Sequence, residues 1–156
     1  MEQTLRCLCE QIEDLYKNVE KWLETTSLQT TREEIEIHEE AFGAYGVPVL
    51  IMRNGADRLV AKMVLVGAHV IGAQGRVNLK GRHDDEILLF LNDGGPTIES
   101  VLEDGGSGKA IKTQLYKGVE ESGWYWIEDK RRGKAHKVSR ELFFELLGSV
   151  SDYVLQ

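Results

Sequence analysis

The sequence of 156 residues has little cysteine, with Cys7 and Cys9 as the only two. On a helix, residues two positions apart point to different faces, so this pair is poorly placed to ligate one metal ion. The two thiols are also too close in the chain to connect distant parts of a fold. Unpaired thiols are typical of a reducing compartment, so we expect a cytoplasmic protein without disulfides.

Long apolar runs are missing too. Charged residues such as Glu2, Arg6 and Glu10 interrupt the N-terminal segment, which excludes the apolar core of a signal peptide there. No run approaches the roughly 18 apolar residues that a membrane span needs. We therefore expect no membrane partner.

The net charge of −7 is concentrated at the front of the chain. Residues 1–40 hold 11 acidic and 4 basic residues, which alone give −7. An acidic surface repels nucleic acids and anionic membranes. A local basic site further along the chain remains compatible with this distribution.

The first 26 residues predict an amphipathic helix, because apolar residues recur every three or four positions among charged ones. Such a stripe usually packs on the core of its own chain. Its heptad-like spacing also allows pairing with a partner chain. The candidate oligomer interface consists of Leu5, Leu8, Ile12, Leu15, Val19 and Trp22.

Residues 33–128 form a strand-rich middle. Residues 33–38 alternate polar and apolar side chains, which is typical of a half-exposed edge strand. The connections are too short for parallel crossovers, so the strands should form an antiparallel meander. Asn54-Gly55 favours a type I′ hairpin turn. Further strands are expected at 47–52, 58–66, 75–80, 87–91, 110–116 and 123–128.

Three expected strands, 47–52, 59–66 and 87–91, are apolar on both sides. A sheet with one face in water should alternate, so both faces need cover from helices, from closure, or from a second subunit. The sequence therefore predicts an α+β fold: an antiparallel β meander, either open or curled into a roll or barrel, flanked by an N-terminal and a C-terminal amphipathic helix. The apolar faces favour self-association.

A glycine-rich loop and a C-terminal helix complete a single domain of residues 1–156. The loop at about 92–109 contains two glycine clusters, with a short helix expected at 97–102 between them. Ser139 is a good N-cap for a helix over 139–155, and Val138 can pack on Phe143 in its first turns.

The most suggestive candidate site joins aromatic residues to a basic turn. Trp124 and Trp126 should lie on one face of a strand and Tyr125 on the other. Aromatic rings beside cations can stack bases and hold phosphates. Alternatively, the tryptophans belong to the core and the charges form a solvated hairpin tip. The candidate binding residues are Trp124, Tyr125, Trp126, Lys130, Arg131, Arg132 and Lys134.

Other motifs fall short of recognised chemistry. The segment 105–109 lacks the first glycine and the hydroxyl residue of a phosphate-binding loop. The segment 83–86 lacks the spacing of a calcium loop and is typical of a polar turn. The acidic segment 34–39 is typical of a solvated edge strand. We therefore assign no catalytic residue, no metal site and no cofactor.

By elimination, the leading hypothesis is a non-catalytic binding or assembly protein that forms a homo-oligomer or binds a protein partner. A nucleic-acid or phospholigand binder using residues 124–137 is an alternative that the acidic net charge does not favour. A metal-dependent hydrolase is a second alternative. It requires histidines and carboxylates to converge in the folded chain.

Overall fold

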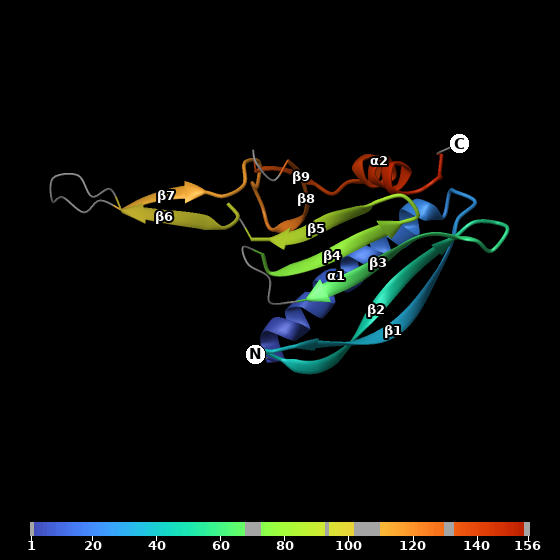
Figure 1. The fold of residues 1–156 in the computed structure, drawn as a ribbon, viewed down its shortest axis with the longest axis horizontal. Coiled ribbons are helices and arrows are strands. Elements are labelled where there is room, and N and C mark those ends of the chain that lie inside the picture. The colour runs from blue at the N-terminus through green and yellow to red at the C-terminus, as the bar shows by residue number, and fades with distance from the viewer. Residues whose placement is uncertain (1, 68–72, 93, 102–109, 130–132, 155–156) are drawn as a thin grey trace.

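The computed structural model describes residues 2–67, 73–92, 94–101, 110–129 and 133–154. The chain begins with a long helix and ends with a shorter one, and the strands lie between them in sequence (Figure 1). In chain order the elements are α1 (Glu2–Leu23), β1 (Gln29–Glu39), β2 (Gly43–Arg53), β3 (Leu59–Gly67), β4 (Gly75–Gly81), β5 (Asp85–Leu91), β6 (Thr97–Val101), β7 (Ala110–Gln114), β8 (Gly123–Asp129), β9 (Lys134–Lys137) and α2 (Arg140–Val150).

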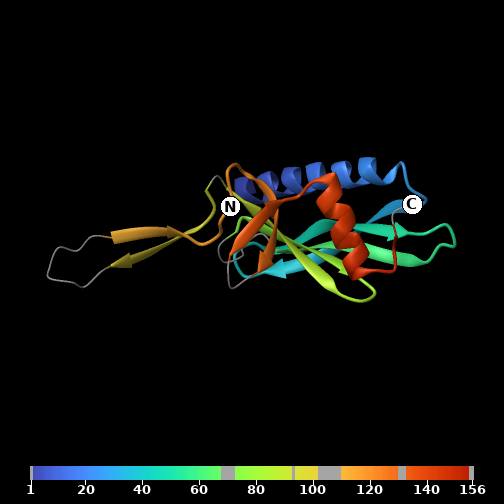
Figure 2. The ribbon, with the colours of Figure 1, turned by 90° about the horizontal axis from the view of Figure 1, so that it is seen from above.

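Seven strands form one antiparallel sheet in the order β1-β2-β3-β4-β5-β8-β9, while β6 and β7 form a separate hairpin. This confirms the α+β class and the antiparallel meander. Within the described ranges the sheet is open, with β1 and β9 at its edges, and β1 is the edge strand that the alternation at 33–38 predicts. The hairpin of β6 and β7 projects from one end of the molecule (Figure 2).

Three local predictions were wrong. The expected helix at 97–102 begins instead as strand β6, paired with β7. Helix α2 ends at Val150 rather than residue 155. The hairpin after β2 is not a two-residue type I′ turn: the Asp57 amide donates to the Asn54 carbonyl at 2.9 Å, and Asp57 adopts a φ of 60°. These features describe a five-residue connection, 54–58, built on a hydrogen-bonded turn.

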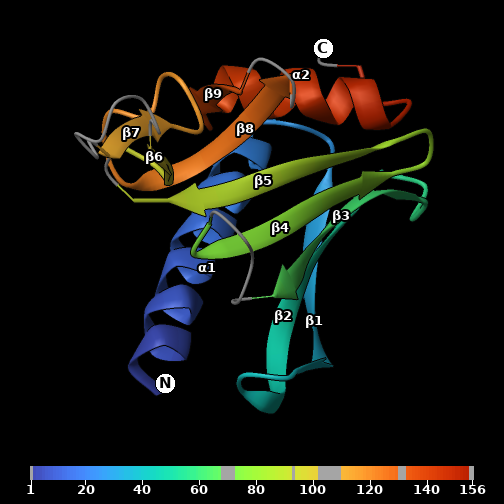
Figure 3. The same ribbon diagram turned by 60° about the vertical axis from the view of Figure 1, so that its left-hand side comes forward.

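Helix α1 packs its apolar stripe against one face of the sheet, behind β3 and β4 in Figure 1, and its upper part passes behind β4 and β5 in Figure 3. Leu8, Ile12, Leu15 and Val19 are at most 4% exposed. They contact a core drawn from β2, β3, β4 and β5. A fully buried aliphatic side chain contributes roughly 1.5–3 kcal/mol, so this stripe anchors the helix.

Tyr16 joins α1 to two strands at the point where those strands separate. Its hydroxyl lies 3.0 Å from the carbonyl oxygens of both Pro48 and Met63. The pairing of β2 with β3 begins next to this point, at Leu50 and Met63. Burial raises the pKa of the Tyr16 phenol well above its usual range, so the hydroxyl remains a hydrogen-bond donor.

Arg32 of β1 reinforces this attachment from outside. Its guanidinium lies 5.6 Å over the Tyr16 ring and contacts the carboxylates of Glu13 at 2.6 Å and Glu20 at 2.5 Å. The hydrogen bond to Glu20 is the main cause of the raised pKa of Arg32. Edge strand β1 is therefore held to the outer side of α1.

Helix α2 packs near the ends of β4 and β5 and contacts the C-terminal part of α1, where Trp22 and Phe143 lie 5.8 Å apart. Ser139 is its N-cap, as predicted, and its hydroxyl accepts a hydrogen bond from the Leu142 amide. At the other end, the Val150 carbonyl accepts a hydrogen bond of 2.8 Å from the His83 amide.

The two faces of the sheet differ in cover. Both helices pack into the same large core on one face. On the other face, Leu89, Leu91 and Tyr125 of β5 and β8 are covered by Tyr116 and Val119 from the segment before β8. Over β5, β8 and β9, the chain itself therefore covers both faces of the sheet, as the apolar strands require.

Replacing Tyr16 with phenylalanine should destabilise the fold by about 1–3 kcal/mol, because two strand carbonyls lose their shared donor. The free energy of unfolding from urea titration measures this loss. Tyr153→Phe is the matched control, since the Tyr153 hydroxyl has no hydrogen bond to a described residue. Equal stability losses in both variants would contradict the role given to Tyr16.

Replacing Gly81 with alanine should destabilise the protein by about 1–3 kcal/mol, because an added Cβ would lie 2.1 Å from the Val150 carbonyl oxygen. Gly55→Ala is the control, since a Cβ there meets no atom within 4 Å. Thermal unfolding of both variants makes the comparison. A Gly81→Ala variant as stable as Gly55→Ala would show that the two backbones approach less closely.

Candidate functional site

The predicted aromatic binding residues lie mainly in the interior. Trp124 is 8% exposed, and its indole donates to the Gln11 carbonyl of α1 at 3.1 Å. Tyr125 is 1% exposed on the opposite face, and its hydroxyl donates to the Glu121 carbonyl at 2.7 Å. In this conformation neither ring is available for a base to stack on.

Trp126 is half-buried, and its indole donates to a Glu86 carboxylate oxygen at 2.7 Å. The His136 ring packs on it, with ring centroids 5.7 Å apart. Of the predicted basic residues, Lys134 is exposed, whereas Lys130, Arg131 and Arg132 lie outside the described residues. The structure therefore places two of the three rings in the interior and leaves this surface undefined.

The predicted oligomer interface on α1 faces the protein's own sheet. Leu8, Ile12, Leu15 and Val19 belong to the main core, and Trp22 is half-buried against it. The side chain of Leu5 lies outside the described set. A partner chain does not reach the four buried residues while α1 stays packed on the sheet.

Histidines and carboxylates meet in pairs on the surface. The contacts are His38 with Glu36, His83 with Asp152, and His136 with Glu128. His69 and the glycine segment at 105–108 lie outside the described ranges. Among the residues that the structure does describe, no group of three or more histidines, cysteines or carboxylates is placed to hold a metal ion.

A surface whose individual residues the sequence did not bring together lies on the face of the sheet opposite the helices. We define the outer patch by the outward residues of β2, β3 and β4: Val49, Ile51, Lys62, Val64, Arg76, Asn78 and Lys80. Val49 and Ile51 are 5% and 6% exposed, and the other five are half-buried. No described segment covers this part of the sheet, which faces the viewer in Figure 1.

The outer patch places two like charges side by side. Lys62 is directly opposite Lys80 in the register of β3 and β4. Neither ammonium group lies within 4 Å of a carboxylate among the described residues. Like charges facing each other across strands are destabilising, so an anion that bound here would relieve a repulsion.

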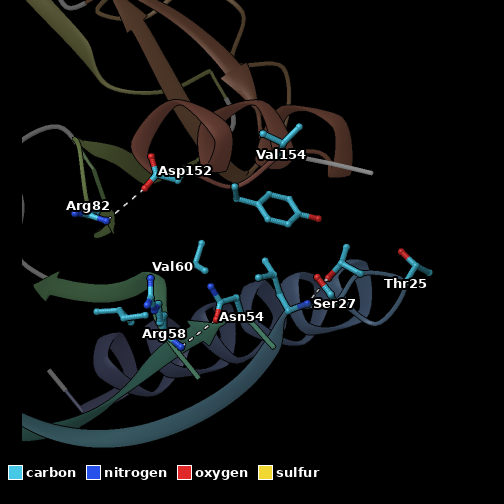
Figure 4. Close-up of a pocket in the computed structure, with 12 residues that line it drawn as sticks. Thr25, Ser27, Asn54, Arg58, Val60, Arg82, Asp152 and Val154 are labelled. Carbon is cyan, nitrogen blue, oxygen red and sulfur yellow. Dashed lines mark hydrogen bonds and ion pairs between the residues drawn. The ribbon is translucent and has the colours of Figure 1, made fainter. Parts of the chain in front are cut away.

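A second surface feature is a groove of about 710 Å³ where four turns and termini converge. It lies between the end of α1, the loop joining β2 to β3, the turn after β4 and the chain beyond α2 (Figure 4). Its lining includes apolar Leu28, Val60 and Tyr153 together with the cations of Arg58 and Arg82. Sequence reasoning missed the groove because its residues come from four separate segments.

Comparisons with known proteins add no family to these observations. No protein-family model, curated protein or solved structure matches the chain. No helix among the residues that the structure describes is long and apolar enough to cross a bilayer. The function therefore has to be argued from the outer patch and the groove themselves.

The contact between His83 and Asp152 should make stability depend on pH. The hydrogen bond from His83, aided by the charge of Arg82, lowers the pKa of the Asp152 carboxyl. A lowered folded-state pKa contributes stability above the unfolded value and loses it as the pH falls through the folded value. Urea midpoints of the parent and of Asp152→Asn should thus differ at pH 6 and converge as the pH falls through the lowered folded-state pKa of Asp152.

A difference between these two proteins that persists unchanged at pH 3 would contradict the role of the carboxylate charge. Asp57→Asn serves as the control, because Asp57 is exposed and its contact with Arg53 is long, at 3.9 Å. Its midpoint should follow that of the parent across the whole range of pH.

Proposed function

We propose that this chain is a non-catalytic binding and assembly protein that forms a homodimer through the outer patch. The pairing of Lys62 with Lys80, beside half-buried Val64 on a sheet face that no described segment covers, carries the proposal. Apolar surface with charges at its margin is the composition of many protein interfaces. An enzyme site would instead need convergent acid, base or metal-binding groups.

A second copy of the chain can supply the missing negative charge. Glu33 of β1 is directly opposite Val49 in the register of β1 and β2, so it belongs to the same face as the outer patch. It is exposed and has no ion pair with a described residue. The face therefore holds charges of both signs, at separate places, that have no ion pair with a described residue.

A two-fold axis running along β2 would satisfy both charges. Such an axis places β1 of one copy over β3 of the other, with two sheets about 10 Å apart. Glu33 is level with Val49 and Lys62 with Ile51, so Glu33 then lies two residues along the strand from Lys62 of the second copy, within reach of these long side chains. The two β2 strands would lie nearest the axis, where Val49 and Ile51 are already nearly buried within one copy and add little surface.

Charge reversal tests this arrangement. Glu33→Lys and Lys62→Glu should each weaken association several-fold to tenfold, because each removes an attraction that occurs twice in a symmetric dimer. Combining the two should restore association towards the parent value, since the exchanged charges at positions 33 and 62 again attract each other across the interface. Sedimentation equilibrium of the four proteins gives the dissociation constants.

Lys17→Glu is the matched control, because Lys17 lies on the outer side of α1 with its side chain 67% exposed. It should leave the dissociation constant within about twofold of the parent. Thermal unfolding checks that all variants fold. A double variant weaker than either single one would refute the pairing of Glu33 with Lys62 and the proposed axis.

A further inference from the structure

The groove described above presents hydrogen-bond donors that the fold leaves unused. The Asn54 carboxamide oxygen accepts from the amides of Ala56 and Arg58, so its NH₂ group is the part left for a ligand. The hydroxyl of Ser27 and the guanidinium of Arg58 have no hydrogen bond to a described residue through their side chains. Such a lining favours a ligand that accepts hydrogen bonds.

The neighbouring hydroxyls of Thr25 and Thr26, by contrast, already form hydrogen bonds within the fold. Thr25 and Thr26 donate to the carbonyls of Trp22 and Leu23 and thereby close the last turn of α1. The Leu28 amide in turn donates to the Thr26 hydroxyl at 3.2 Å. This wall of the groove is thus fixed by backbone contacts and does not depend on a ligand for its shape.

The opposite wall is fixed as well. The Ser151 hydroxyl donates to the Leu147 carbonyl at 2.6 Å and accepts from the Tyr153 amide at 3.2 Å. The hydrogen bond from the His83 amide to the Val150 carbonyl attaches the turn after β4 to the same wall. A site that exists before its ligand arrives loses less entropy on binding.

The charges of the groove give a local excess of one positive charge in a protein of net charge −7. Arg58 and Arg82 contribute two cations, and Asp152 contributes one anion. Asp152 pairs with His83, whereas its contact with Arg82 is long, at 3.6 Å. Arg82 therefore keeps capacity for a second anion (Figure 4).

We propose that this groove binds a carboxylate attached to an apolar group. One excess positive charge matches a singly charged carboxylate, and planar guanidinium groups bind carboxylates through paired hydrogen bonds. Leu28, Val60 and Tyr153 supply the apolar surface beside the two arginines. The volume of about 710 Å³ lies within the range of small-ligand sites.

Calorimetric titration with 4-phenylbutyrate tests the proposal on the full chain. The compound should bind in the millimolar range or tighter. The neutral analogue 4-phenylbutanamide should bind about tenfold more weakly, because it loses the charge-assisted hydrogen bonds. Equal binding of acid and amide, or binding of neither, would overturn the proposal. Tighter binding of 4-phenylbutyl phosphate would overturn the assignment to a singly charged ligand.

Arg58→Gln and Arg82→Gln should each weaken binding of 4-phenylbutyrate several-fold to tenfold. Arg53→Gln is the control, since Arg53 lies on the same hairpin but does not line the groove, and it should bind as the parent does. A loss in Arg53→Gln as large as in Arg58→Gln would place the site elsewhere. Thermal unfolding of each variant excludes a loss through misfolding.

The carboxylate has two possible sources, a small molecule or the C-terminus of a polypeptide. An acetylated tetrapeptide ending in leucine, compared with its C-terminal amide, distinguishes them. Tighter binding of the peptide acid than of 4-phenylbutyrate assigns a polypeptide terminus, and weaker binding assigns a small carboxylate. Glu33 does not line the groove, so the Glu33→Lys variant should still bind 4-phenylbutyrate as the parent does. Failure of dimerisation and failure of ligand binding can therefore be told apart.

Discussion

The attachment of α1 to one face of the sheet is the constraint on which the other features depend. The buried stripe of α1, with Tyr16 bonded to two strands, draws the longest helix onto the side where α2 also packs. Both helices therefore cover the same face. On the opposite face, the residues of β2, β3 and β4 can be shielded from water only by neighbouring long side chains or by another molecule.

On the face of the sheet opposite the helices, the chain itself covers one part and leaves the other part open. The segment carrying Tyr116 and Val119 covers β5 and β8, and its backbone also bonds to the outer edge of β9, where the Ala135 amide donates to the Lys117 carbonyl at 2.8 Å. No described segment covers β3 and β4 in the same way. The chain thus leaves half-buried Val64 beside Lys62 and Lys80, which have no ion pair with a described residue, on this part of the sheet alone.

Much of the fold could be predicted from sequence because the relevant patterns are local. Three of these patterns each depend on the residues of a single helix or strand: the apolar stripe of α1, the alternation of β1 and the N-cap Ser139 of α2. The helix expected at 97–102 failed because strand pairing with 110–114 outweighs local preference. The turn at Asn54 failed because its side chain bonds two amides and stabilises a longer loop.

Candidate sites were harder to predict, because the spacing of residues within one segment does not show which residues of different strands or helices lie close together. Trp124 and Tyr125 were predicted to bind a ligand because they are aromatic and lie near cations in the sequence. The register of β8 with β5 instead buries each ring, on opposite faces of the sheet. Lys62 and Lys80 are far apart in the chain, and only the register of β3 and β4 brings them together. The apolar character of strands 47–52 and 59–66 was the one sequence signal that pointed towards this surface.

Lysine footprinting at two protein concentrations tests whether a second copy of the chain covers Lys62 in the outer patch. An amine-reactive acylating reagent, followed by mass spectrometry, reports the labelling of each lysine. We expect Lys62 to become protected as the protein concentration rises, because β1 of the second copy lies over β3, while Lys17 and Lys21 on α1 label equally throughout. Labelling of Lys62 that does not change with concentration would contradict the proposed dimer.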